Sequence, residues 1–281
     1  DVQAFLADRP DAGNVNGSPE TTASKFAVNF GNKLTENTEI YGDAAYIYKR
    51  VNSFANYRTP YWRTEEAFPY LADFFPDGEN GEYVGYVPTF EGLLNDYNAT
   101  LGFRTKKNGW IADLSFTVGG NQQTYKVNDS HNRNEVLVPN WVDANGNSQQ
   151  EPSEVTYAQR YRENSPITFD PGATRFTHTV GNIDITRRLS DRIGIAFGSE
   201  FRNENFTIIE GELSSYEAGG GDSFAGADPR NSGKFNRYNF GGYADAAFYI
   251  TADFLVSAPV RLQYDSDFAN ASLSQVTSPT T

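Results

Sequence analysis

The fold is decided by residues 192–204, which read RIGIAFGSEFRNE. Apolar residues alternate there with small or charged ones. The apolar positions are Ile193, Ile195, Phe197 and Phe201, and the charged positions that follow the other parity are Glu200, Arg202 and Glu204. Because successive side chains of a β-strand point to opposite faces, this stretch predicts a strand with one apolar and one polar face.

The same alternation occurs in two further stretches of the chain. Residues 109–118 place Trp110, Ala112, Leu114, Phe116 and Val118 on one face and Asp113, Ser115 and Thr117 on the other. Residues 244–265 place Ala244, Ala246, Phe248, Val260 and Leu262 opposite Asp245, Arg261 and Asp265. Small residues are common on these apolar faces, which lipid tolerates, whereas the core of a soluble β-sandwich would favour larger side chains. We therefore expect Ile195, Phe197, Val260 and Leu262 to face outward, and Glu200, Arg202, Asp245 and Arg261 to face inward.

Strand-like segments follow one another in four predicted hairpins. They pair residues 24–33 with 38–52, 97–106 with 109–126, 173–188 with 192–209, and 237–250 with 254–266. Between the hairpins lie three long loops, residues 53–96, 127–172 and 210–236, although most connections in compact domains run about 4–6 residues. Short turns at one end and long loops at the other are typical of outer-membrane β-barrels, and strands of about ten residues suit a tilted crossing of a bilayer.

Composition excludes several other classes of protein. The net charge of −13 argues against nucleic-acid binding, which requires clustered Lys and Arg. The absence of cysteine excludes disulfide scaffolds and thiolate metal sites. No apolar run reaches the length of a membrane helix, but barrel strands hide their apolar residues in alternation. The sequence starts at Asp1 without an initiator methionine, so we expect it to be part of a longer protein.

A family resemblance extends this interpretation. Residues 172–176 (GATRF), 180–187 (VGNIDITR) and 195–206 (IAFGSEFRNENF) resemble the middle barrel strands of TonB-dependent receptors, and residues 243–268 resemble the next strand pair. The resemblance implies an all-β fold, an antiparallel transmembrane β-barrel that is partial here, with about eight strands in four hairpins and long extracellular loops. It divides the chain into a loop segment at 1–23, a barrel portion at 24–268 and a tail at 269–281 that adds no strand.

The resemblance also implies a function and a set of partners. The intact receptor would lie in the cell outer membrane and import a scarce nutrient such as a siderophore, cobalamin or a glycan. Its partners would be outer-membrane lipid, a small-molecule nutrient ligand and the TonB complex, contacted through an N-terminal part that this chain lacks. The expected protein is not an enzyme and has no cofactor. The alternative is a soluble or small-barrel β-rich binding or adhesion module that presents long loops; a glycan-processing enzyme would need two carboxylates facing one cleft.

Candidate ligand-binding residues concentrate in the first long loop. They are the aromatic residues Tyr57, Tyr61, Trp62, Phe68 and Tyr70, whose rings can stack on sugars or aromatic chelates. The same rings could instead pack the loop against its neighbours or form the aromatic girdle at the membrane interface.

Other candidates for metal binding or catalysis are weaker. Residues 77–82 and 143–147 carry oxygen ligands at short spacing, but neither completes a twelve-residue calcium loop, which favours ordinary turn chemistry. His131 and His178 are the only histidines, too few for a metal site or a catalytic triad without cysteine.

Overall fold

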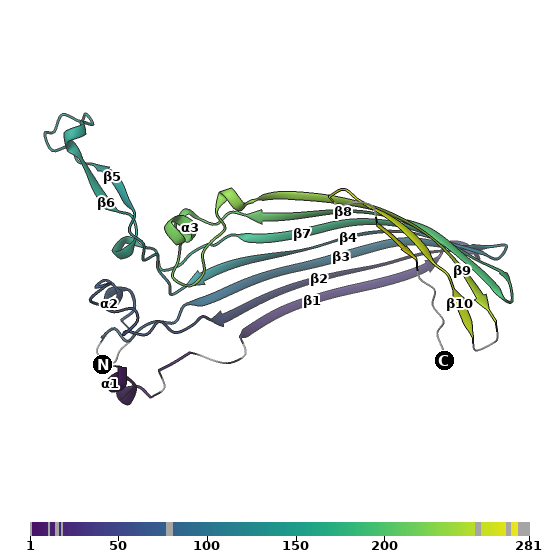
Figure 1. The fold of residues 1–281 in the computed structure, drawn as a ribbon, viewed down its shortest axis with the longest axis horizontal. Helices are drawn as coiled ribbons and strands as arrows, with labels where there is room; N and C mark the ends of the chain where they lie inside the picture. Colours follow the sequence, from purple (N-terminus) through teal and green to yellow (C-terminus); the bar gives the residue numbers. More distant parts are fainter. Residues whose placement is uncertain are drawn as a thin grey trace.

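The computed structural model describes residues 2–10, 12–14, 17, 19–76, 81–250, 254–267 and 271–274. Its main feature is a single ten-stranded antiparallel sheet of long strands, from one end of which the long loops project (Figure 1). The strand order is β1-β2-β3-β4-β7-β8-β9-β11-β12, with β10 also paired to β9. The all-β, antiparallel fold predicted from the alternation is thereby confirmed.

The bounds of the elements follow the predicted hairpins. The strands of the main sheet are β1 (Glu20–Lys33), β2 (Thr38–Phe54), β3 (Thr89–Lys107), β4 (Trp110–Asn128), β7 (Ala173–Ser190), β8 (Ile193–Ile209), β9 (Gly233–Tyr249), β10 (Leu255–Ser257), β11 (Val260–Asp265) and β12 (Ala271–Ser274). A separate two-stranded hairpin consists of β5 (Leu137–Trp141) and β6 (Val155–Gln159). The helices are short: α1 (Val2–Asp8), α2 (Leu71–Phe74), α3 (Leu213–Tyr216), and the 3-10 turns η1 (Pro152–Glu154), η2 (Arg162–Asn164), η3 (Glu217–Gly219) and η4 (Pro229–Asn231). None of the helices in the described part of the chain is long and apolar enough to span a membrane.

Tight turns close the hairpins at one end of the sheet. Between β3 and β4 the two turn residues Asn108 and Gly109 have φ angles of 51° and 80°. Positive φ at both central positions defines a type I′ turn, for which Asn-Gly is the preferred sequence because its twist matches that of the flanking strands. The three long loops all leave from the opposite end of the sheet, as the hairpin series predicted (Figure 1).

The strands differ from the sequence prediction in several places. β3 begins at Thr89 instead of residue 97, because residues 89–96, in which apolar and polar residues do not alternate, pair with β2 up to Phe54. The last predicted strand is interrupted at Pro259, which has no N–H to donate, although Ala247 pairs with Ser257 and Ala244 with Val260 in one unbroken register. The expectation that residues 269–281 add no strand is wrong, because β12 pairs with β11; residues 268–270 and 275–281 lie outside the described residues.

The N-terminal segment also contains regular structure. Within residues 1–23, predicted to be loop, α1 forms a short helix and β1 begins at Glu20. The β5–β6 hairpin, which the sequence analysis placed in the loop 127–172, projects away from the main sheet (Figure 1).

The main sheet has one apolar and one polar face, as predicted. The register aligns Phe197 with Ala244 and Ala244 with Val260, so these side chains share a face, while Glu200 has the opposite parity on β8. The apolar face is exposed over its whole width, with exposed fractions of 64% for Phe26, 53% for Phe116 and 62% for Leu262. No second layer covers it among the described residues, which is unusual because soluble monomers rarely expose large apolar areas.

The polar face is cross-linked by side chains of neighbouring strands. Arg104 of β3 donates to Asp113 of β4 at 2.7 Å and to Glu39 of β2 at 3.2 Å. Arg261 of β11 lies 3.7 Å from Glu200 of β8, which confirms that these two predicted inward residues share a face. Polar contacts therefore join β2 to β4 and β8 to β11 on this face.

A repeated arrangement of tyrosine, glycine and aspartate joins three strands at two places on this face. Tyr41 of β2 lies over Gly102 of β3 and donates a hydrogen bond of 2.6 Å to Asp113 of β4. Tyr243 of β9 lies over Gly198 of β8 and donates a hydrogen bond of 2.6 Å to Asp184 of β7. In both cases the ring occupies the space that a Cβ atom on the glycine would take.

Buried hydrophobic residues concentrate at the loop end of the molecule. One buried cluster belongs to the loop between β2 and β3 and consists of Tyr70, Leu71, Phe75, Tyr83 and Tyr86. The other buried hydrophobic residues lie in β4, in β7 and in the loop between them, and are Val127, Tyr161, Phe169, Ala173 and Val180. The loop between β2 and β3 therefore has a fixed structure of its own at the loop end of the sheet.

Candidate functional site

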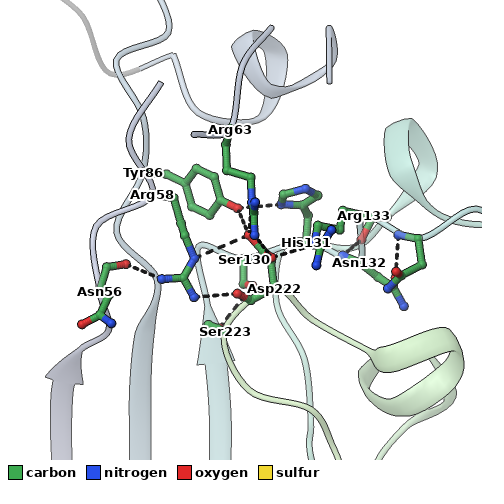
Figure 2. A network of polar contacts seen from close by, with 12 residues as sticks. Asn56, Arg58, Arg63, Tyr86, Ser130, His131, Asn132, Arg133, Asp222 and Ser223 are labelled. Atoms are coloured by element: carbon green, nitrogen blue, oxygen red, sulfur yellow. Dashed lines mark hydrogen bonds and ion pairs between the residues drawn. The ribbon is translucent and has the colours of Figure 1, made fainter. Parts of the chain in front are cut away.

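Three loops meet at the loop end of the sheet and share one buried polar network (Figure 2). They are residues 55–88 between β2 and β3, residues 129–172 between β4 and β7, and residues 210–232 between β8 and β9. The network is centred on Asp222, whose side chain is only 3% exposed.

Both oxygens of the Asp222 carboxylate accept hydrogen bonds from the other loops. Oδ1 accepts from Arg63 and Arg133, and Oδ2 accepts from Arg63 and Tyr86. Arg63 donates from Nε at 2.8 Å and from Nη2 at 2.7 Å, and the Tyr86 hydroxyl donates at 2.7 Å. Arg133 donates from Nε at 2.8 Å. The Asp222 main chain adds two more contacts, because its carbonyl accepts from Arg58 Nη2 at 2.6 Å and its N–H donates to the His131 carbonyl at 2.9 Å.

The network contains an excess of positive charge. The guanidinium groups of Arg58, Arg63 and Arg133 all form ion pairs with the one carboxylate of Asp222. Burial by itself would raise the pKa of Asp222, but the hydrogen bonds from Arg63 and Tyr86 and the charge of Arg63 outweigh it, so this pKa lies below its usual value. Asp222 is therefore ionised at neutral pH and compensates the buried arginines.

His131 is fully buried beside this network. Its Nδ1 lies 3.2 Å from the Tyr86 hydroxyl, and its ring is surrounded by aromatic rings of the first loop. Burial lowers its pKa to about 4, so the imidazole is neutral at neutral pH. Nε2 of His131 has no hydrogen-bond partner within the part of the chain that the structure describes. His178, by contrast, lies in β7 and packs against Phe176 with a ring-centroid distance of 5.7 Å.

The predicted ligand-binding aromatics divide into exposed and packed residues. Tyr61 and Trp62 are exposed, with fractions of 44% and 54%, and the centre of the Trp62 ring lies 4.1 Å from the Arg63 guanidinium. Tyr70 is buried in the loop core, and Phe68 packs edge-on against it at a ring-centroid distance of 6.1 Å. The fifth residue, Tyr57, has its hydroxyl bonded to the Val84 carbonyl.

Tyr57 also lines a cavity of about 420 Å³ between the N-terminal segment and the first loop. Its lining combines rings with polar groups and includes Arg9, Tyr57, Phe74, Phe75, Tyr86 and Asp129. The cavity therefore does not unite the predicted aromatics: Tyr61, Trp62, Phe68 and Tyr70 are not part of its lining.

A second set of polar contacts joins the loop after β8 to the loop between β4 and β7. The Glu217 carboxylate accepts from Arg160 at 2.8 Å and from the Tyr161 hydroxyl at 2.7 Å. These hydrogen bonds, first that of Tyr161, lower the pKa of Glu217. The Asn132 side-chain amide bridges to the carbonyls of Ser214 and Glu217 at 3.1 and 3.0 Å.

Of the two acidic segments that were compared with calcium loops, the structure describes one fully and the other only in part. In the segment 143–147, the Asp143 carboxylate accepts backbone N–H groups of Gly146, Asn147 and Ser148, which supports the turn interpretation. Glu154 accepts from the backbone of Ala144 and Asn145 in the same way. In the segment 77–82, residues 77–80 lie outside the described residues.

Sequence reasoning missed the residues at the centre of the site. Arg63 and Asp222 are 159 positions apart, and Tyr86 and Asp222 are 136 apart. No local pattern links such residues, because the contacts exist only once three loops have folded against one another. The abundance of aromatics in the first loop was the only sequence signal that pointed to this region.

Comparison with known proteins gives only structural matches. No family model and no curated protein matches the chain. Two solved structures that resemble it are mutant forms of the ferric enterobactin receptor PfeA from Pseudomonas aeruginosa, each with 10% identity over 97% of this chain, and TM-scores of 0.48 and 0.46. A third, the outer membrane transporter YddB from Escherichia coli, has 11% identity over 93% of this chain and a TM-score of 0.37. The chain spans about a third of the length of these proteins, with coverages of 34%, 34% and 36%.

Proposed function

We propose that this chain forms part of the wall of an outer-membrane TonB-dependent receptor, which imports a small-molecule nutrient. The observation that carries the proposal is the exposed apolar face of the main sheet. Lipid is the solvent that such a face fits, because it accepts apolar side chains that water does not. The partner on this face is therefore outer-membrane lipid.

Strand length supports a membrane crossing. The six strands β2, β3, β4, β7, β8 and β9 have 17 to 19 residues each, whereas a tilted membrane strand needs about 9–11. The apolar run from Trp110 to Val118 on β4 rises about 27 Å at roughly 3.4 Å per residue, close to the height of about 25 Å of a barrel's apolar band. The remaining length of each strand would stand clear of the membrane.

Aromatic residues at the two edges of the apolar face fit the same arrangement. Tyr46 pairs with Tyr97 towards the loop end, and Trp110 lies at the turn end under the guanidinium of Arg187, 4.9 Å from its ring centre. Aromatic girdles at both membrane interfaces are a feature of outer-membrane barrels.

The polar face fits an aqueous lumen. A hollow of about 380 Å³ on this face is lined by three carboxylates and three guanidinium groups, and its charged members are Glu200, Glu204, Asp265, Arg202, Arg237 and Arg261. Charged side chains that alternate with lipid-facing ones point into the interior of a barrel. The two faces together match a barrel wall.

Nutrient uptake and its energy source are extensions of this proposal. The loop end would face the outside, where the exposed rings of Tyr61 and Trp62 offer a stacking surface for a siderophore, cobalamin or a glycan. The TonB complex would be contacted by a part of the protein outside this chain. In the alternative, a soluble binding or adhesion module, another layer of protein would have to cover the apolar face and shield it from water.

A matched pair of substitutions on β4 tests the proposal in the full-length protein. Phe116→Arg places a charge on the apolar face, where it costs about 2–4 kcal/mol at the membrane midplane, and Thr117→Arg places it on the polar face of the next residue. We expect Phe116→Arg to abolish the heat-modifiable folded band on gels and Thr117→Arg to keep it. A full-length protein that stays soluble without detergent, and in which both variants fold equally well, would contradict a membrane wall.

A further inference from the structure

The loop after β8 does more than connect two neighbouring strands. Phe224 of this loop packs against Phe90 at the start of β3 and Tyr125 near the end of β4, with ring-centroid distances of 5.7 and 5.5 Å. β3 is three places away from β8 in the sheet. The loop therefore passes across the ends of β7 and β4 to reach its contacts.

These contacts lie on the polar face. Phe90 pairs with Val127, and residues 121, 123, 125 and 127 of β4 share the face of Asp113 because the β3–β4 register has no shift. Phe224 is thus held against the polar face at the loop end, and not against the apolar face.

Asp222 attaches the same loop to the loop that follows β2, on the far side of β3. Arg58 and Arg63 belong to the loop that follows β2, and both form ion pairs with Asp222, at 3.5 and 2.7 Å. Because both arginine side chains are about 10% exposed or less, they depend on this carboxylate for compensation of their charge.

We infer that residues 217–224 form a strap across the loop end of the polar face and that Asp222 is the latch that holds the strap in place. Glu217 anchors the near end of the strap to Arg160 and Tyr161, Phe224 covers β4 and β3, and Asp222 fastens the strap to the loop after β2. Releasing the latch leaves the Glu217 anchor intact, so the strap opens from its Asp222 side. The proposal takes from the proposed function only that the polar face lines an enclosed lumen.

The latch can be tested by thiol labelling in a full-length protein whose other cysteines, if any, are replaced, because these 281 residues contain none. Asn121→Cys places a reporter at an exposed position on the polar face of β4, four residues before Tyr125. Its reaction rate with a bulky hydrophilic maleimide is measured in the full-length protein in outer membranes, with and without the additional substitution Asp222→Asn. The matched control is Asp228→Asn, because Asp228 pairs only with Arg230 of its own loop among the described ion pairs.

The expected result is at least about a tenfold faster labelling with Asp222→Asn and an unchanged rate with Asp228→Asn. Tyr86→Phe, which removes the hydroxyl contacts with Asp222 and His131 and keeps the ring, should give an intermediate rate. Folding of each variant is checked by heat-modifiable gel mobility. Equal labelling rates with and without Asp222→Asn, in folded protein, would overturn the strap.

A second reporter separates failure of the strap from failure of the proposed function. Phe116→Cys lies on the apolar face, which lipid should shield from the hydrophilic reagent. If this thiol reacts as fast as an exposed loop thiol introduced by Ser148→Cys, the membrane assignment fails. Hydrogen exchange of residues 55–63 and 129–133 then tests the latch directly: faster exchange in Asp222→Asn supports it, and unchanged exchange overturns it.

Discussion

Arg63 and Asp222 form a bidentate pair, with Nε and Nη2 at 2.8 and 2.7 Å from the two carboxylate oxygens, although 159 residues separate them along the chain. The pair is nearly buried on both sides, at 10% and 3% exposure. Parallel charge-assisted hydrogen bonds of this kind are both strong and directional. The loop after β2 and the loop after β8 are consequently held together by the geometry of one contact.

Replacing Arg63 by lysine should loosen the loops although the charge is kept. Lysine cannot donate two parallel hydrogen bonds, and a lost charge-assisted bond costs about 1.5–3 kcal/mol. We expect faster amide hydrogen exchange in residues 55–63 and 220–224. The control is Arg230→Lys, whose side chain is 87% exposed, so that its effect should stay within about 0.5 kcal/mol. Equal hydrogen-exchange rates in the two variants would contradict a role of the bidentate Arg63–Asp222 pair in holding the loops.

The stability of the loop core should fall in mild acid because of His131. Its pKa is lowered from 6.5 to about 4 in the folded protein, so the unfolded loops bind more protons between these values. The contribution of His131 to stability therefore declines as the pH falls from 6.5 to about 4 and is constant below that; the total loss is about 3 kcal/mol at roughly 1.4 kcal/mol per pKa unit. Hydrogen exchange of the loop core at several pH values measures this slope.

His131→Gln is the control for this pH dependence. It removes the titrating group from the same position, and the decline between pH 6.5 and about 4 should then disappear. A slope of the same size in His131→Gln would assign the effect to other groups.

Alanine at both Tyr61 and Trp62 should weaken ligand binding without affecting folding. Each stacked ring adds about 0.5–1.5 kcal/mol beyond the area it buries, so the loss of two rings should reduce affinity roughly tenfold or more. The measurement is equilibrium binding of a ferric chelate, cobalamin and an oligosaccharide to the full-length protein. Tyr157→Ala removes another exposed ring, from β6, and should leave affinity unchanged.

Unchanged affinity in a folded Tyr61/Trp62 double variant would assign these rings to packing or to the interface. The search for a ligand platform would then move to residues 127–172 or 210–236. Tyr70 and Phe68 are poorer targets for this test, since Tyr70 is buried in the loop core and Phe68 packs against it.

Alanine at Gly102 should destabilise the sheet. Its Cβ would occupy the space of the Tyr41 ring, whose hydroxyl bonds Asp113, and overpacking of this kind costs about 1–3 kcal/mol. The midpoint of urea unfolding of the full-length protein in detergent should fall. Gly31→Ala is the control, because nothing lies within 4 Å of its added Cβ. A midpoint that falls equally in both variants would contradict the role of the tyrosine.

The alternation of residues was sufficient to predict the sheet but not the site. Faces and hairpins follow from local rules, such as the parity of Phe197 and Glu200 or the Asn108-Gly109 turn, and the structure confirms them. The first half of β3 was missed because residues 89–96 lack the alternation of apolar and polar residues, with Leu93 and Leu94 adjacent. The Asp222 network could not be predicted, since it depends on how three irregular loops pack together.

The two glycines beneath tyrosine rings have a consequence for the shape of the whole sheet. Gly102 and Gly198 carry no side chain on the polar face, and their neighbours Tyr41 and Tyr243 lie across them towards an aspartate on the strand beyond. Glycine positions of this kind are where a β-sheet can bend sharply, and the covering ring restores the packing that glycine lacks. β3 and β8 are therefore places where this sheet can curve without leaving a gap on its polar face.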